Sequence, residues 1–154
     1  MIREQVSDFH RANGVPILDT PQVPADERVR LRLRLIAEEF CELLAASLAD
    51  GEGQNSLVDH IGWTLREHIN SAAPRVDLVE VADALADLDY VIEGTRLEFG
   101  IDGAPIAAEI HRSNMSKLGP DGKPVLRPDG KITKGPSYSP PDVARELLRQ
   151  GWKP

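Results

Sequence analysis

The sequence predicts an all-α protein: a bundle of four to five helices with an irregular or hairpin-containing C-terminal tail, assembled as an oligomer. Two long apolar segments, at about 25–49 and 77–99, have the period of an α-helix. Clusters of proline and glycine separate the helical segments. The length of 154 residues and the hydrophobic fraction of 41% are enough for a single domain, 1–154, with its own core.

Residues that start or stop helices bound each expected element. Gly14 ends a short first helix, and Pro16, Pro21 and Pro24 make the next segment an extended connector. Gly100 ends the second long helix. The expected helices cover residues 1–13, 25–49, 57–70, 77–99, 104–117 and 142–149.

The C-terminal part differs in composition from the helical core, which we expect over 1–118. Two copies of Pro-Asp-Gly-Lys, at 120–123 and 128–131, predict tight turns or a small hairpin, since Asp-Gly is a turn former. Its basic side chains make residues 119–154 a basic, turn-rich tail, which we expect to be ordered.

Composition excludes several kinds of partner. The formal net charge of −7 argues against binding to nucleic acid, because a phosphate-backbone binder carries a basic face. We find no signal peptide, and no segment reaches the roughly 18 apolar residues of a membrane span. The lone cysteine, Cys41, lies in an apolar run and is expected to be packed rather than reactive. We therefore expect a cytoplasmic protein.

Three glutamates interrupt the first long apolar segment. Glu38, Glu39 and Glu42 fall within two helical turns in "AEEFCELL" (37–44). Leu31 and Leu35 share the helical sector of these acids at about 100° per residue. This helix is therefore expected to be covered on most sides. Carboxylates placed so close together are costly when buried, unless something compensates their charge.

A second acidic stripe lies on the other long helix. Glu80, Asp83 and Asp87 fall within about 60° of one another at 100° per residue. Two such stripes that face each other gather five or six carboxylates, a cluster that is strongly destabilising without cations. Because Mg²⁺ and Mn²⁺ prefer carboxylate oxygen, the pattern predicts a site for two or more of these ions.

Two other interpretations of the stripes stay open. Charged i, i+4 patterns are usually solvated helix faces, and both stripes could be of that kind. A di-iron bundle also uses carboxylates, but its Glu-x-x-His motifs are missing from this sequence. His60 and His68 are interpreted as ordinary surface or packing residues.

The carboxylate pattern resembles the signature of a known family. "EEFCE" (38–42) followed by "EVAD" (80–83) is similar to the Glu-Glu-x-x-Glu … Glu-x-x-Asp signature of the MazG-like, all-α nucleoside triphosphate pyrophosphohydrolases of the HisE/MazG superfamily. "EIHRSNMSKLGPDGK" (109–123), "KGPSYSPPD" (134–142) and "DFHRANG" (8–14) resemble further segments of these proteins, including phage-encoded single-domain members. The resemblance covers most of the chain.

One departure concerns the second half of the signature. In many relatives the signature aspartate precedes a Leu-Leu-Tyr-like run, and that alignment selects Asp87 and puts Ala84 where the paired glutamate should be. The other register selects Glu80 and Asp83. We favour Asp83 and Asp87, which lie four residues apart on one helix face. The two halves are also further apart than is common, consistent with an extra segment at about 50–75.

The resemblance implies hydrolysis of a (deoxy)nucleoside triphosphate between the α and β phosphates, giving the monophosphate and pyrophosphate. Glu38 would position or deprotonate the attacking water. The three glutamates of the first stripe, Glu38, Glu39 and Glu42, are the expected catalytic residues. The metal ions would be held by carboxylates of both stripes: Glu39, Glu42, Asp83, Asp87 and Glu80.

Substrate-binding residues are expected outside the stripes. By resemblance, Asn114 and Lys117 near a helix end would contact phosphate or sugar. Trp63 is a weaker candidate for stacking on the base. The remaining candidates would close over the triphosphate or contact the base: Lys131, Lys134, Tyr138, Phe9 and His10.

The sequence leaves the base open. The phage-like tail favours a (d)GTP-directed enzyme, of the kind found beside 2-aminoadenine metabolism, slightly over a dUTP-directed one. The alternative to an enzyme is a non-catalytic, regulatory helical module that binds nucleotide without hydrolysing it. The family usually assembles as dimers or tetramers, and the apolar character of residues 29–49 agrees with a homodimer or homotetramer.

Overall fold

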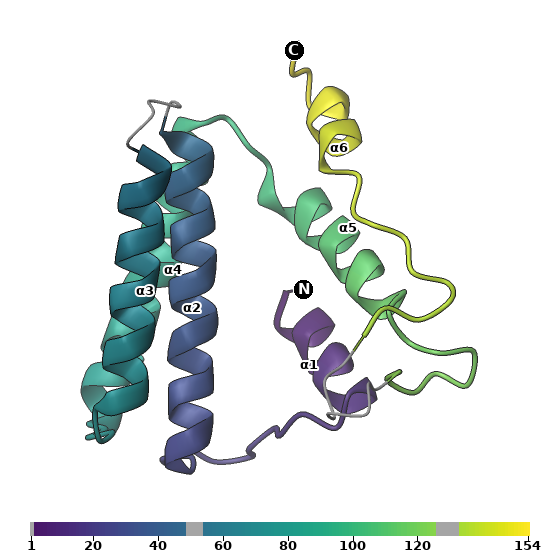
Figure 1. Cartoon of the computed structure of the whole chain (residues 1–154). Coiled ribbons are helices and arrows are strands. Elements are labelled where there is room, and N and C mark those ends of the chain that lie inside the picture. Colours follow the sequence, from purple (N-terminus) through teal and green to yellow (C-terminus); the bar gives the residue numbers. More distant parts are fainter. Residues whose placement is uncertain (1, 49–53, 126–132) are drawn as a thin grey trace. The chain divides into compact units, whose positions relative to one another are not determined.

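A computed structural model describes residues 2–48, 54–125 and 133–154, with only the backbone described for 54–56. These residues form six α-helices, which confirms the all-α prediction (Figure 1). None of the helices in the described segments is long and apolar enough to cross a membrane. Five helices belong to the expected helical core, and the sixth, in the tail, agrees with the short helix expected at 142–149. The helices are α1 (Ile2–Ala12), α2 (Asp26–Ser47), α3 (Gln54–Ser71), α4 (Leu78–Glu98), α5 (Gly103–Met115) and α6 (Val143–Arg149).

Aspartates and glycines set most of the helix ends. The side chains of Asp77, Asp102 and Asp142 accept hydrogen bonds from backbone N–H groups in the first turns of α4, α5 and α6. Gly14 and Gly100 follow α1 and α4 with φ angles of 64° and 68°. Glycine adopts this left-handed conformation without the steric cost of a Cβ, so both residues act as the predicted helix stops.

Packing divides the chain into two compact units, which we describe separately. The α2–α3 unit (Pro21–Ala82) contains α2 and α3, which lie side by side (Figure 1). Two arginines of α2 fix one end of this pair. Arg30 donates a hydrogen bond of 3.0 Å to the carbonyl oxygen of Ala72, and Arg34 donates one of 2.8 Å to Asn70 Oδ1. These contacts set α2 and α3 in an antiparallel register.

The α5–α6 unit (Met1–Thr20 with Asp83–Pro154) is built around α5. Both α1 and α6 pack against α5 (Figure 1). At the start of α5, the backbone of Asp102 and the side-chain amide of Gln150 exchange two hydrogen bonds, of 2.8 and 3.0 Å. The end of the tail is therefore tied to the start of α5.

Glu109 is the central polar group of this unit, and its side chain is only 6% exposed. Arg112 donates two hydrogen bonds of 2.8 Å to its carboxylate, and the backbone N–H of Asp142 donates a third of 2.8 Å. Arg145 of α6 lies 3.3 Å from the same carboxylate. One buried carboxylate thus joins α5 to the N-terminus of α6.

The tail is ordered where the structure describes it. In the first Pro-Asp-Gly-Lys copy, the N–H of Gly119 donates to the carbonyl oxygen of Lys123 at 2.8 Å, and Gly122 has a φ of 72°, which confirms the predicted turn. Further on, the N–H of Gly135 donates to the carbonyl oxygen of Lys117 at 3.0 Å. A Cβ at Gly135 would lie 2.7 Å from that oxygen, so only glycine fits there. The second copy lies outside the described residues.

Apolar side chains remain uncovered in the single chain, and none is buried among the described residues. On α2, Leu33, Phe40 and Leu43 are about half exposed. On α4, Val79 and Tyr90 are 76% and 81% exposed. Because α3 packs against only one face of α2, the cover expected on the other sides of α2 stays a prediction for the assembled protein.

We predict that Glu109 makes the stability of the protein depend on pH. The hydrogen bonds from Arg112 and from the backbone of Asp142 lower the pKa of Glu109 from 4.5 to about 2. Because folding lowers this pKa, the stabilisation is complete above pH 4.5 and is lost as the pH falls towards 2. Thermal unfolding should show a Glu109→Gln variant with a lower Tm at neutral pH and a smaller further fall over this acidic range.

The matched control is Glu93→Gln. Glu93 makes one ion pair of 2.9 Å with Arg96, and its side chain is 60% exposed. An exposed pair of this kind contributes little to stability, so the control should keep the wild-type Tm and pH profile. A Glu109→Gln variant with the wild-type profile would show that this carboxylate does not stabilise the tail.

Candidate active site

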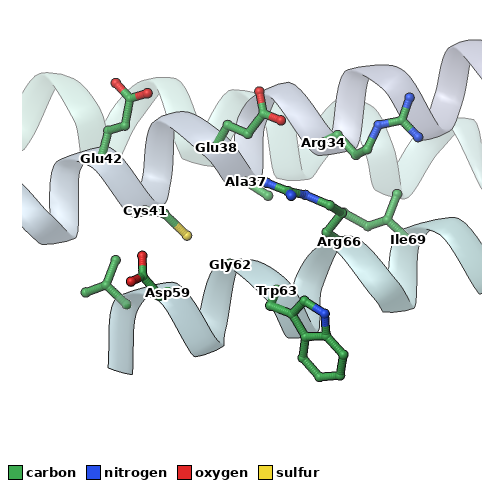
Figure 2. A pocket seen from close by; sticks show the side chains of 11 residues that line it. Arg34, Ala37, Glu38, Cys41, Glu42, Asp59, Gly62, Trp63, Arg66 and Ile69 are labelled. Carbon is green, nitrogen blue, oxygen red and sulfur yellow. The ribbon is translucent and has the colours of Figure 1, made fainter. Parts of the chain in front are cut away.

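The glutamates of the first stripe are exposed on α2. Glu38 and Glu42 line a groove of about 340 Å³ between α2 and α3, whereas Glu39 is not among its lining residues. Figure 2 shows the carboxylates of Glu38 and Glu42 on the same side of α2, both pointing away from α3. Both groups are therefore accessible to cations or ligands outside the helix pair.

Close contact between the two helices positions the groove. A Cβ added at Gly62 of α3 would lie 3.4 Å from Cys41 Sγ, an ordinary van der Waals distance, so the two helices approach closely at this level. Cys41 is thus packed against α3, as predicted. Asp59 and Arg66 lie one turn to either side of Gly62 and also line the groove (Figure 2).

Sequence reasoning missed Asp59 and Arg66 as groove residues. Their positions with Gly62 at i, i+3 and i+7 indicate a shared helix face, and this spacing is the signal that could have identified them. Trp63 also lines the groove, and its ring stacks on that of His60 with 6.1 Å between centroids. His60 is therefore a packing residue, as expected.

The second stripe is exposed on α4, where it comprises Glu80, Asp83 and Asp87. Within the described parts of the chain, none of the six stripe carboxylates makes a side-chain hydrogen bond or an ion pair. The boundary between the two units falls inside α4, between residues 82 and 83. The meeting of the two stripes therefore stays a prediction.

The chemistry of the stripes fits hard divalent cations. All six side chains offer carboxylate oxygen, which Mg²⁺ and Mn²⁺ prefer over nitrogen or sulfur ligands. In the ranges that the structure describes, no three His, Cys, Asp or Glu side chains are grouped closely enough to hold a metal ion. The structure thus brings Glu38 and Glu42 into one groove, and the complete ligand set stays a prediction.

Most of the predicted substrate-binding residues meet in the α5–α6 unit. Phe9 of α1, Lys117 and Lys134 line a pocket of about 400 Å³. Lys117 Nζ donates a hydrogen bond of 2.8 Å to Asn114 Oδ1, and Lys134 Nζ lies 4.4 Å from the centre of the Tyr138 ring. This basic pocket therefore combines two ammonium groups with an aromatic side chain.

Two predicted residues are not part of this grouping. His10 Nδ1 lies 3.2 Å from the carbonyl oxygen of Pro16, so the ring contacts the connector that follows α1. Lys131 lies outside the described residues. Contacts of either residue with substrate stay predictions.

Comparison with known proteins identifies both family and fold. Residues 6–114 match the model of a family described as phosphoribosyl-ATP pyrophosphohydrolase. The structure also matches a crystal structure from Exiguobacterium sp. 255-15, of a protein whose assignment as an NTP pyrophosphohydrolase is itself provisional, with 27% sequence identity and a TM-score of 0.74. That match covers 97% of this chain and 95% of the other. No curated protein matches the chain in sequence.

The family match includes the carboxylate signature and ends before most of the tail. It contains both halves of the carboxylate signature, at 38–42 and 80–83, together with Asp87 and Asn114. The structural match extends over most of the tail as well. The resemblance to the HisE/MazG superfamily is confirmed. The chain therefore belongs to the phosphoribosyl-ATP pyrophosphohydrolase family and is an all-α hydrolase.

Proposed function

We propose that the protein hydrolyses a (deoxy)nucleoside triphosphate between its α and β phosphates, with Mg²⁺ or Mn²⁺, to the monophosphate and pyrophosphate. The observation that carries this proposal is the set of exposed stripe carboxylates, which lack a counter-charge among the described residues of a pyrophosphohydrolase-family chain. By contrast, the buried carboxylates of Glu109 and Glu146 are paired with arginines. The stripes are therefore the acids available for cations and substrate.

Each part of the stripes has a role in this reaction. Bound divalent ions would supply Lewis-acid chemistry, which offsets the triphosphate charge and acidifies water. Glu38 would orient the attacking water and accept its proton. The water oxygen then bonds to the α-phosphorus, the bond to the bridging oxygen breaks, and pyrophosphate leaves. The residues proposed to hold the ions are Glu39, Glu42, Asp83, Asp87 and Glu80.

The basic pocket would bind the phosphates and the nucleoside. Lys117 and Lys134 provide positive charge against phosphate oxygens. The hydrogen bond from Lys117 to Asn114 restricts where the ammonium group can lie, and Tyr138 does the same for Lys134. Phe9 offers an aromatic surface for the base or sugar. His10 and Lys131 are proposed as further contacts.

The proposal also specifies the preferred nucleotide and the oligomeric state. We favour (d)GTP over dUTP because the tail resembles that of phage-encoded proteins. The apolar side chains left exposed on α2 and α4 support a homodimer or homotetramer, since uncovered apolar surface of this kind is usually buried in an interface. The reaction would act in nucleotide-pool control in the cytoplasm.

The products identify the bond that is cleaved. We expect each molecule of accepted (d)NTP to give one monophosphate and one pyrophosphate with Mg²⁺ or Mn²⁺, and (d)GTP to react fastest. Anion-exchange chromatography and a pyrophosphate assay measure the two products. Diphosphate with orthophosphate would refute the bond assignment, and no turnover of any nucleotide would favour the non-catalytic binding module.

A Glu39→Gln substitution should lower kcat on the order of 100-fold or more, because it removes one carboxylate charge from the proposed metal ligands. Its Tm should stay unchanged, since the side chain is exposed. Glu27→Gln, at an exposed position in the first turn of α2, is the matched control and should keep full activity. Full activity in Glu39→Gln would remove this residue from the site.

A Lys117→Gln substitution should raise the KM for the nucleotide about tenfold or more, since a hydrogen bond to a charged group is lost, with a smaller change in kcat. Lys123→Gln removes the same charge from the exposed turn and should leave the KM unchanged. Steady-state kinetics at saturating Mn²⁺ measure both. Equal KM values for the two variants would contradict a phosphate contact by Lys117.

A further inference from the structure

We propose that Arg66 of α3 binds the triphosphate of the substrate. This residue lies outside both halves of the carboxylate signature, in the segment that separates them. The inference rests on the proposed function, because it needs a nucleotide bound beside the carboxylates of α2. It adds a positive charge from α3 to a groove that Glu38, Glu42 and Arg34 of α2 also line.

The first argument is that Arg66 has no structural partner. Two other arginines at the contact of α2 with α3 already make hydrogen bonds within the protein. Arg30 donates to the carbonyl oxygen of Ala72 at 3.0 Å, and Arg34 donates to Asn70 Oδ1 at 2.8 Å. Within the described residues, Arg66 makes no hydrogen bond and no ion pair. Its guanidinium thus keeps five N–H donors for a ligand or water.

The second argument is the position of Arg66. The antiparallel register, in which Cys41 meets Gly62, sets residue 66 close to the level of Glu38. Figure 2 shows the side chain of Arg66 crossing the groove to lie beside Ala37, the neighbour of Glu38. Arg66 shares the groove lining with Glu38 and Glu42 but pairs with neither. The groove lining therefore contains a guanidinium together with the proposed catalytic Glu38 and the proposed metal ligand Glu42, and no ion pair joins it to either.

The third argument is charge and shape. Carboxylates repel a triphosphate, and bound ions neutralise only the phosphate oxygens that they contact. A guanidinium presents paired donors that match two oxygens of one phosphate. Arg66, which has no partner among the described residues, can therefore bind a phosphate group next to divalent ions at the carboxylates of α2.

The test is calorimetric binding of a nucleoside triphosphate analogue with a non-hydrolysable α–β bridge, at saturating Mn²⁺. Arg66→Gln should weaken binding of this analogue about tenfold or more, since a hydrogen bond to a charged phosphate is lost. Arg66→Lys should fall between the wild type and Arg66→Gln, because it keeps the charge but loses the paired donors. The Tm of both variants should match the wild type.

Arg75→Gln is the matched control, since it removes the same charge from an exposed loop position outside the groove lining. It should bind the analogue like the wild type. Unchanged binding in Arg66→Gln, or a loss no greater than in Arg75→Gln, would overturn the inference. A lower Tm with unchanged binding would assign Arg66 a purely structural role and would overturn it too.

Binding and hydrolysis are separable in this design. If wild-type protein binds the analogue through Arg66 but hydrolyses no nucleotide, the proposed function fails and the inference about Arg66 stands. If wild-type protein hydrolyses nucleotides and Arg66→Gln binds the analogue normally, the proposed function stands and the inference fails.

Discussion

The unpaired negative charge of the stripe carboxylates on α2 and α4 is the constraint on which the proposed site depends. The arginines of α5 and α6 pair with the buried acids Glu109 and Glu146. On α2, Arg30 bonds to a carbonyl group and Arg34 to an amide. The described stripe carboxylates receive none of them. Arginine pairing therefore stabilises the tail, whereas the stripe acids of α2 and α4 have no such partner in the described part of the chain.

The local features of the fold could be predicted from the sequence. Periodicity located all six helices, and Gly14 and Gly100 act as the helix stops that their positions predict. The Asp-Gly turn before Lys123 also follows from short-range chemistry. The acidic series at 38–42 and 80–83, together with the tail segments that resemble the same family, predicted the family that the match over residues 6–114 shows.

The parts that could not be predicted depend on contacts between distant segments. Arg66 looks like any solvated helix residue until the register of α3 on α2 places it beside Glu38. Gly135 looks like a loop glycine until its close approach to the end of α5 is seen. The exposure of Phe40 could not be foreseen either, because the sequence shows that a residue is apolar and not which surface covers it.

The proposed hydrolytic acids and the opposite wall of the groove lie on different helices, so substitutions can change one without changing the other. The acids proposed for the reaction belong to α2 and α4, whereas α3 contributes one wall of the groove and none of the acidic signature. Substitutions on the groove side of α3 can therefore change the shape and charge of the groove without altering the acidic signature. At Gly62 this face of α3 approaches Cys41 closely, so the groove keeps its floor where the two helices meet.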